Sequence, residues 1–378
     1  MGAEKVFFVK NDPVIIFCTL QNNPQDEQSL LETFRRVWCM SRPQILFIAL
    51  PGELRLYRLD RPPTRDIESL RKNQQLELIK KVAEVAKKLQ DYRREQVESG
   101  RLFGDSRFGG VDQRADKRLI QDLKTVRKSL LATDLEPKYA HALIGRSIFI
   151  RYLEDRGVID LDYFEKVAKK HPRWQELLSQ EPSRPDLAPR SEEHKYYRVL
   201  LDKDFTYALF QQLADDFNGD MFPKDEQEEK QVTGDHLKLL HDFLLGDTDQ
   251  ERPHLFLWAY DFEIIPIELI SSIYEEFYHK ENIYRLDKNK ESKKQDDIKT
   301  HYTPSVLVEY ILSSILPKER LATKPKIIDP ACGSGIFLVE SFRRIVRYRV
   351  QQQHSIKLSP DTLRQMLREQ IRGIEINE

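Results

Sequence analysis

The chain has 378 residues and a formal net charge of −1 at pH 7, with 61 Lys or Arg against 62 Asp or Glu. This length exceeds one ordinary hydrophobic core and predicts several domains. The balanced charge excludes a global basic field but not a local basic surface. The three cysteines, Cys18, Cys39 and Cys332, form neither a CxxC pair nor a cluster with histidine. Their spacing argues against a structural metal site and for reduced thiols in the cytoplasm.

The longest apolar runs, Pro13–Leu20 and Ile45–Leu50, are strand-sized. They fall far short of the roughly 20 residues that a membrane helix needs. The N-terminal Met-Gly-Ala-Glu-Lys lacks the apolar centre of a signal peptide. We therefore expect a cytoplasmic protein without a membrane partner.

Residues 1–62 are predicted to form a small α/β domain. Helical spacing of apolar residues predicts a helix over Asp26–Met40, and Pro51-Gly52 predicts a hairpin turn. Short apolar runs predict four strands: Val6–Val9, Val14–Leu20, Ile45–Leu50 and Glu53–Leu59. A metal-dependent nuclease would need an Asp on one strand and Glu-x-Lys on the next. Val14–Leu20 contains neither an acid nor a lysine, so a nuclease-like fold without its active site is an alternative, and no metal ligands are predicted.

Residues 63–112 are expected to be a long helix and a linker, with the helix over Asp66–Val97 and a glycine-rich break after it. Residues 113–286 are predicted to be a helical domain around a buried central helix, Ala140–Arg156. The charged residues of that helix could contact DNA, but ion pairs within the protein are the favoured reading: Arg146, Arg151, Glu154, Asp155 and Arg156. Asp225–Lys230 is expected to be a solvated charge run, and a strand-like piece is expected just before Pro266. The polar residues 287–300 are expected to be a flexible linker.

Residues 301–378 carry the pattern that points to a ligand. Strands are predicted at Lys326–Asp329 and Ile371–Ile376, and helices at Ile336–Tyr348 and Pro360–Arg372. The glycines of Asp329-Pro330-Ala331-Cys332-Gly333-Ser334-Gly335 then lie in a strand-to-helix turn, where backbone N–H groups are accessible to a ligand. This order of elements is typical of the first half of a doubly wound nucleotide site.

Two ligand classes compete for this turn. A dinucleotide fingerprint requires G-x-G-x-x-G, and Leu338 occupies the position of the third glycine. Asp329 would also repel a pyrophosphate. S-adenosylmethionine fits better, because Asp329 can attract its positive charges and Glu375 can accept both ribose hydroxyls. An ordinary tight turn in an α/β domain is the remaining alternative.

The turn, together with Phe337, resembles the cofactor motif of adenine-N6 DNA methyltransferases, especially the modification subunits of type I restriction systems and fused type IIG enzymes. His301-Tyr302-Thr303-Pro304 resembles the segment of that family that closes over the methionine end of the cofactor. Gly373-Ile374-Glu375-Ile376-Asn377 resembles the second cofactor motif. The resemblance implies that S-adenosylmethionine contacts a set of residues at these motifs: Tyr302, Thr303, Pro304, Asp329, Pro330, Ala331, Cys332, Gly333, Ser334, Gly335, Phe337 and Glu375.

The resemblance further implies a Rossmann-like class I methyltransferase sheet, double-stranded DNA as partner, and a specificity domain or subunit. In that family an Asn/Asp-Pro-Pro-Tyr/Phe segment holds the flipped adenine. The only Pro-Pro here is Pro62-Pro63, without a following aromatic. We therefore expect no catalytic residue in this chain, which resembles the front of a longer methyltransferase of a restriction-modification or phage-defence system. A non-catalytic DNA-binding or assembly module with a vestigial cofactor loop is the alternative, and transfer to RNA or protein remains open.

Overall fold

The computed structural model describes residues 3–9, 12–21, 27–104, 108, 114–180, 194–217, 222, 225–246, 257–265, 303, 305–333, 335–353 and 357–374. The chain divides into two compact units, Met1–Ile265 and Pro266–Glu378. The described part combines a small sheet with many helices, so the mixed α/β expectation is confirmed. The finer domain boundaries stay predictions.

The first unit begins with a five-stranded sheet. Its strands follow one another in space in chain order: β1 (Ala3–Val9), β2 (Asp12–Thr19), β3 (Ile45–Leu50), β4 (Glu53–Arg58) and β5 (Gln75–Ile79). Strands β2 and β3 are parallel and joined by helix α1 (Glu27–Cys39), and all other pairs are antiparallel. The four predicted strands, the helix and the hairpin at Pro51-Gly52 are thus confirmed.

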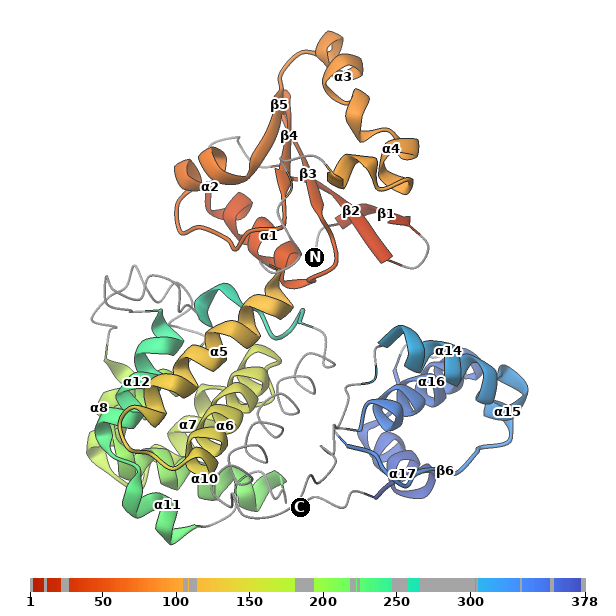
Figure 1. The fold of residues 1–378 in the computed structure, drawn as a ribbon. Helices are drawn as coiled ribbons and strands as arrows, with labels where there is room; N and C mark the ends of the chain where they lie inside the picture. The colour runs from red at the N-terminus through yellow and green to blue at the C-terminus, as the bar shows by residue number, and fades with distance from the viewer. Residues whose placement is uncertain are drawn as a thin grey trace, which may run out of the picture. The chain divides into compact units, whose positions relative to one another are not determined.

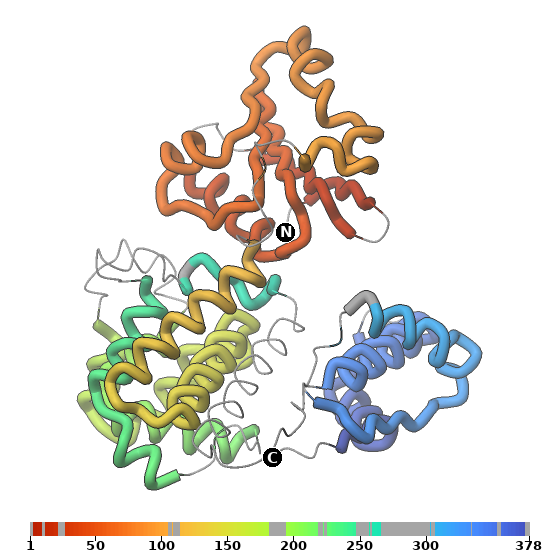
Figure 2. Tube along the Cα trace, viewed as in Figure 1, coloured from red at the N-terminus to blue at the C-terminus, as the bar shows by residue number. Residues whose placement is uncertain are grey.

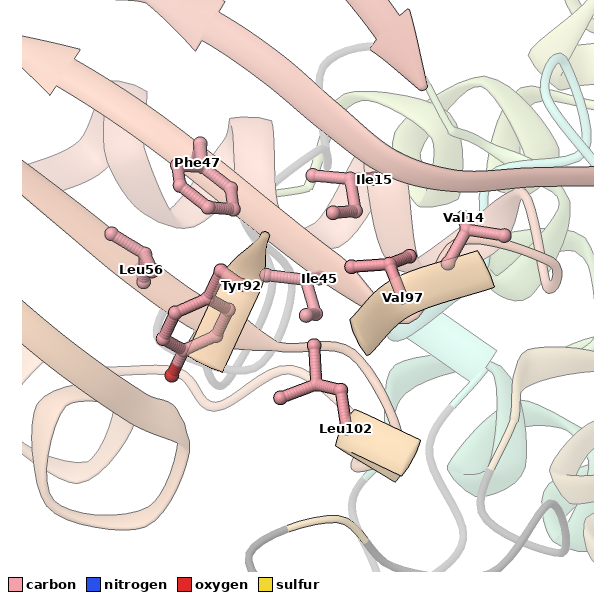
Figure 3. Packing of buried hydrophobic residues seen from close by; sticks show 8 residues of the cluster. All are labelled: Val14, Ile15, Ile45, Phe47, Leu56, Tyr92, Val97 and Leu102. Carbon is pink, nitrogen blue, oxygen red and sulfur yellow. The ribbon is translucent and has the colours of Figure 1, made fainter. Parts of the chain in front are cut away.

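Successive residues of a strand point to opposite faces of the sheet. In this sheet, apolar side chains are buried on both faces. On the α1 side, the ring centroid of Phe34 lies 6.1 Å from that of Tyr57 in β4. The other face packs against short helical pieces of residues 82–104 (Figures 1 and 3). Their buried cluster consists of Val14, Ile15, Ile45, Phe47, Leu56, Tyr92, Val97 and Leu102.

The prediction of one long helix over Asp66–Val97 is wrong. The segment instead forms β5 and several short helices: α2 (Ile67–Gln74), α3 (Val82–Lys88), η1 (Gln90–Tyr92), α4 (Arg94–Glu98) and η2 (Arg101–Gly104). Strand β4 offers an unpaired edge, and β5 satisfies it with antiparallel pairs from Leu54↔Ile79 to Tyr57↔Gln75. Tertiary pairing therefore overrides the local helical pattern. Val82, which the expected helix would place on its apolar face, is 90% exposed.

The second half of this unit is helical, as expected (Figure 1). It contains α5 (Ala115–Leu131), α6 (Pro137–Asp155), α7 (Leu161–Ala168), α8 (Pro172–Ser179), α9 (Tyr196–Val199), α10 (Lys203–Phe217), α11 (Glu226–Gln231) and α12 (Gly234–Leu245). Helix α6 is buried around most of its circumference, including Leu143, Ile150 and Leu153. It is the predicted central helix.

The charged residues of α6 form ion pairs inside the protein. Arg146 donates to both carboxylate oxygens of Glu228 at 2.6 and 3.0 Å. Arg151 donates to Glu154 at 2.8 Å and to Asp155 at 3.1 Å. The preference for ion pairs over DNA contacts is confirmed for these two arginines. The prediction that Asp225–Lys230 is solvated is wrong at Glu228. This residue is buried and forms an ion pair with Arg146.

The segment Leu257–Ile265 joins the sheet to the helices. It starts with a 3₁₀ turn, η4 (Leu257–Ala259), and not with the expected strand. Its side chains and backbone bind three helices: Asp261 pairs with Arg35 of α1 at 3.2 Å, Tyr260 donates to Asp122 of α5 at 3.0 Å, and the Phe262 N–H donates to Asp155 of α6 at 2.9 Å. These buried polar contacts, and not hydrogen bonds to a neighbouring strand, hold the segment in place.

The second unit contains two short strands and four helices in its described part: α14 (Ser305–Ile315), α15 (Lys318–Ala322), β6 (Ile327–Asp329), α16 (Ile336–Gln352), α17 (Pro360–Gln370) and β7 (Ile371–Gly373). Figure 2 shows this chain path in blue. Strands β6 and β7 are parallel, with Ile327 opposite Ile371. The predicted order of strand, glycine turn, helices and strand is confirmed.

Two apolar clusters hold this unit together. Val308, Leu312 and Leu316 pack against Ile336 at the start of α16, while Ile345, Met366 and Ile371 join α16 to α17 and β7. Ile327 of β6 packs against both clusters. The sheet pair and its glycine turn are therefore anchored on one face by α14, α16 and α17.

Candidate functional site

The turn between β6 and α16 is shaped by one carboxylate and two glycines. The backbone N–H of Ala331 donates to Oδ1 of Asp329 at 3.1 Å, and the N–H of Gly335 donates to the carbonyl oxygen of Cys332 at 2.8 Å. Gly333 has a φ of 51° and Gly335 a φ of 81°. Such left-handed angles cost a residue with a β carbon free energy, so the sequence Gly-Ser-Gly makes this tight reversal accessible.

Strand β7 lies beside the turn and extends its pairing into it. The N–H of Ile374 donates to the carbonyl oxygen of Asp329 at 2.9 Å, and the N–H of Cys332 donates to the carbonyl oxygen of Ile374 at 3.0 Å. Since the two strands are parallel, their carboxyl ends meet at one edge. Ligands of open α/β sheets bind at that edge.

Helix α16 begins at Gly335, its N-cap residue, and no side chain caps it. The first N–H groups of a helix have no partner within the helix, and they form the positive end of its dipole. Pro330, Ala331 and Gly333 are exposed, and Asp329 is partly exposed. A β carbon at Gly335 would meet nothing within 4 Å. The turn therefore offers open space and one carboxylate to a ligand, and the start of α16 offers backbone N–H groups.

This combination suits a ligand that carries positive charge and hydroxyl groups. A carboxylate repels a diphosphate but attracts an ammonium or sulfonium group. Backbone N–H groups can donate to neutral acceptors as well as to anions. The residues present thus fit S-adenosylmethionine in their donor and acceptor chemistry.

Helix α14 is locked beside α16 by polar contacts. Arg344 pairs with the carboxylate of Glu309 at 2.6 Å and donates to the hydroxyl of Ser313 at 3.1 Å. Phe337, in the first turn of α16, packs against the apolar cluster that contains Val308 of α14. The start of α14 and the glycine turn are therefore parts of one packed body.

The structure brings one group of the predicted site residues into a single turn: Asp329, Pro330, Ala331, Cys332, Gly333 and Gly335. Phe337 follows in α16, where its packing is structural, and its contact with a cofactor stays a prediction. Thr303 is described and partly buried, two residues before α14. The remaining predicted site residues lie outside the described residues: Tyr302, Pro304, Ser334 and Glu375.

Gly373 is a residue of this site that the predicted set omits. A β carbon there would come within 2.9 Å of the Cys332 sulfur, so the turn and β7 approach closely only because position 373 is glycine. A glycine inside a strand pattern is a known indicator of close backbone approach. The pattern Ile371-Arg372-Gly373-Ile374 contained that indicator.

Within the described ranges, no three side chains of His, Cys, Asp or Glu gather as a metal site would require. No helix in this part of the chain combines the length and apolar character needed to cross a membrane.

Comparison with known proteins supports the class that the turn indicates. Residues 268–377, which include the turn and both strands of the second unit, match the sequence model of a family described as N-6 DNA Methylase. No curated protein and no solved structure matches the chain. The match is confined to residues 268–377 and supports the resemblance of this segment to N-6 DNA methyltransferases. The type of restriction system stays a prediction.

Proposed function

We propose that this chain supplies the cofactor-binding part of a DNA methyltransferase that moves a methyl group from S-adenosylmethionine to the N6 atom of adenine. The observation that carries the proposal is the turn from Asp329 to Gly335, which lies at the carboxyl edge of a parallel strand pair within the segment that matches the N-6 DNA methylase family. The full protein would serve in a restriction-modification or phage-defence system.

The bound cofactor would supply the methyl group, and the residues of this chain would bind and orient it. Asp329 would attract the positively charged part of the ligand, while the open space at Gly335 would admit it to the start of α16. Thr303, with Tyr302 and Pro304, would contact the methionine end. Glu375 would accept hydrogen bonds from the ribose hydroxyls. A Rossmann-like sheet would extend from β6 and β7.

Local charge favours DNA as the partner. The second unit, residues 266–378, holds 19 Lys or Arg against 16 Asp or Glu, whereas the first unit holds 42 against 46. An excess of positive charge on one unit attracts the phosphate backbone in a salt-dependent manner. The base itself would be held by an Asn/Asp-Pro-Pro-Tyr/Phe segment, which these 378 residues lack. We therefore propose that the chain alone binds cofactor without transferring the methyl group, and that a specificity domain or subunit selects the DNA sequence.

The alternative is a DNA-binding or assembly module whose glycine turn no longer binds a cofactor. Two measurements separate the two functions. Calorimetric titration of the 378-residue protein with S-adenosylmethionine should show saturable binding, which a vestigial turn would not. In cells, an Asp329→Ala change in the encoding gene should abolish N6-methyladenine at one DNA sequence, measured by mass spectrometry of nucleosides and by sequencing. Unchanged methylation at every sequence would overturn the proposal.

A further inference from the structure

We infer that Gly373 is a positioning residue of the cofactor turn. It holds no ligand itself, but its missing side chain lets Cys332 and Leu338 lie against strand β7, and this contact sets where the turn stands. The geometric part of the inference depends only on contacts among described residues. The part that concerns cofactor affinity rests on the proposed function.

The environment of Gly373 differs from that of the other glycines. A β carbon built there would lie 2.7 Å from Cδ1 of Leu338 and 2.9 Å from Sγ of Cys332. Both distances are far below van der Waals contact. Built β carbons meet nothing within 4 Å at seven other glycines: Gly52, Gly100, Gly104, Gly145, Gly157, Gly234 and Gly335. Gly373 is thus required for close approach, whereas these seven glycines leave room for a β carbon.

The requirement at Gly373 is steric and not conformational. Gly373 ends strand β7 and does not belong to the glycines with positive φ. Alanine can therefore adopt its backbone angles without strain. Any effect of alanine must pass through the two side chains that it meets.

Those side chains belong to the turn and to the helix that follows it. Cys332 is bound to β7 through its N–H, which donates to Ile374 at 3.0 Å, while Asp329 accepts from the N–H of Ile374 at 2.9 Å. Both hydrogen bonds are made by Ile374, the residue after Gly373, and they hold the turn beside the end of the strand. A methyl group at position 373 would displace two side-chain ends, Sγ of Cys332 and Cδ1 of Leu338, and their displacement would shift the turn and the first turn of α16. The glycine backbone and the carboxylate of Asp329 would then no longer be aligned for one ligand.

The first test measures the turn without any ligand. Cys332 is partly exposed, whereas Cys18 and Cys39 are buried, so alkylation with iodoacetamide, resolved by site with mass spectrometry, reports on Cys332. Gly373→Ala in the full chain should alkylate several-fold faster at Cys332 than the parent. The matched control is Gly104→Ala, which adds the same methyl group where nothing lies within 4 Å, and it should leave the rate unchanged. An unchanged rate in Gly373→Ala would overturn the geometric inference.

The second test measures affinity for S-adenosylmethionine by calorimetry in two backgrounds. In the parent, Gly373→Ala should weaken binding about tenfold, because overpacking displaces the turn. In the Cys332→Ala/Leu338→Ala background the same change should cost little, since the atoms that it meets are gone. An equal loss in both backgrounds would contradict a role through these side chains.

The outcomes distinguish this inference from the proposed function. A parent protein that does not bind S-adenosylmethionine sinks the proposed function, and the alkylation rates then decide on Gly373 alone. If the parent binds S-adenosylmethionine, and Gly373→Ala changes neither the affinity nor the alkylation rate of Cys332, the inference about Gly373 is wrong. The proposed function is then unaffected.

Discussion

The backbone N–H of Cys332 donates a 3.0 Å hydrogen bond to the carbonyl oxygen of Ile374, and this bond joins the glycine turn to the end of strand β7. The two residues are far apart in the chain, yet one hydrogen bond puts the turn after β6 beside the residue that precedes Glu375 in sequence. It brings the Asp-Pro-Ala-Cys-Gly stretch and Gly373-Ile374 to one edge of the strand pair.

Asp329 has two separable tasks, to shape the turn and to carry charge. Asp329→Asn keeps a side-chain oxygen that can accept from the Ala331 N–H, now at 3.1 Å from Oδ1, but removes the negative charge. It should retain the stability of the parent and weaken S-adenosylmethionine binding. Asp329→Ala loses both features and should also reduce the free energy of unfolding by about 1 kcal/mol. Urea denaturation and calorimetry measure the two effects; equal ligand affinity for Asp329→Asn and the parent would contradict the role of charge.

Gly335 should tolerate substitutions in the order set by left-handed backbone propensity. At a φ of 81°, alanine should cost about 1–2 kcal/mol and asparagine less, because asparagine adopts this conformation more readily. Nothing lies within 4 Å of an added β carbon, so sterics do not contribute. Denaturant unfolding of both variants checks this, with Gly104→Ala as control. Alanine and asparagine at equal stability would argue against backbone strain as the cause.

Asp155 should be needed for the stability of the first unit. Its Oδ1 lies 3.1 Å from Arg151 and 2.6 Å from His194, and its Oδ2 accepts from the Phe262 N–H. Although burial alone would raise it, these partners hold the pKa of Asp155 well below its usual range. Asp155→Asn leaves the buried Arg151 with one carboxylate, Glu154, in place of two, and the loss of a charged hydrogen-bond partner should cost about 2–3 kcal/mol.

The matched control for Asp155 is Glu98→Gln. Glu98 pairs with Arg94 at 2.7 Å on the surface, and exposed pairs contribute at most about 1 kcal/mol. Since the folded pKa of Asp155 is depressed, its contribution is present above about pH 4 and lost as the pH falls further. Urea denaturation at pH 7 and pH 3 measures both effects. Similar losses for the two variants at pH 7 would contradict the importance of burial.

The contribution of Asp122 to stability should depend on pH in the opposite direction. Burial raises the pKa of its carboxyl to about 7, although Arg118 and Tyr260 oppose the rise. Between about pH 4 and pH 7 the folded protein therefore holds a proton that the unfolded chain has lost, so stability falls as the pH rises through this window. The loss is at most about 4 kcal/mol.

Asp122→Asn should remove that slope. Compared at pH 5 and pH 8 by urea denaturation, the parent should lose more stability than the variant as the pH rises. The ion pair with Arg118, 3.2 Å away, is absent from the variant at both pH values and, because Asp122 is protonated, from the parent at pH 5. Parallel pH profiles for the two proteins would contradict the raised pKa.

The sequence predicted those elements whose pattern is local. Strands β1 to β4, helix α1 and the glycine turn all follow from apolar spacing and turn residues in adjacent positions. Strand β5 was missed because Leu76 and Ile79 fit a helical spacing equally well, and the unpaired edge of β4 that selects the strand is not visible in the segment itself.

Ion pairs between residues far apart in the chain could not be predicted from the sequence. Glu228 stands in a run of charged residues that resembles a solvated surface, and only the fold brings it to Arg146, 82 positions earlier. For the candidate site, the turn residues were predicted together, whereas Gly373 was omitted because its role depends on how closely Cys332 and Leu338 approach β7.

The central claim is that the turn from Asp329 to Gly335 selects a positively charged nucleoside over a diphosphate. The most direct measurement is calorimetric titration of the 378-residue protein with S-adenosylmethionine and, separately, with NAD⁺ and ADP. The account predicts saturable one-site binding of S-adenosylmethionine, lost in Asp329→Ala, and no binding of either diphosphate. Binding of NAD⁺ or ADP, or no binding of S-adenosylmethionine, would contradict it.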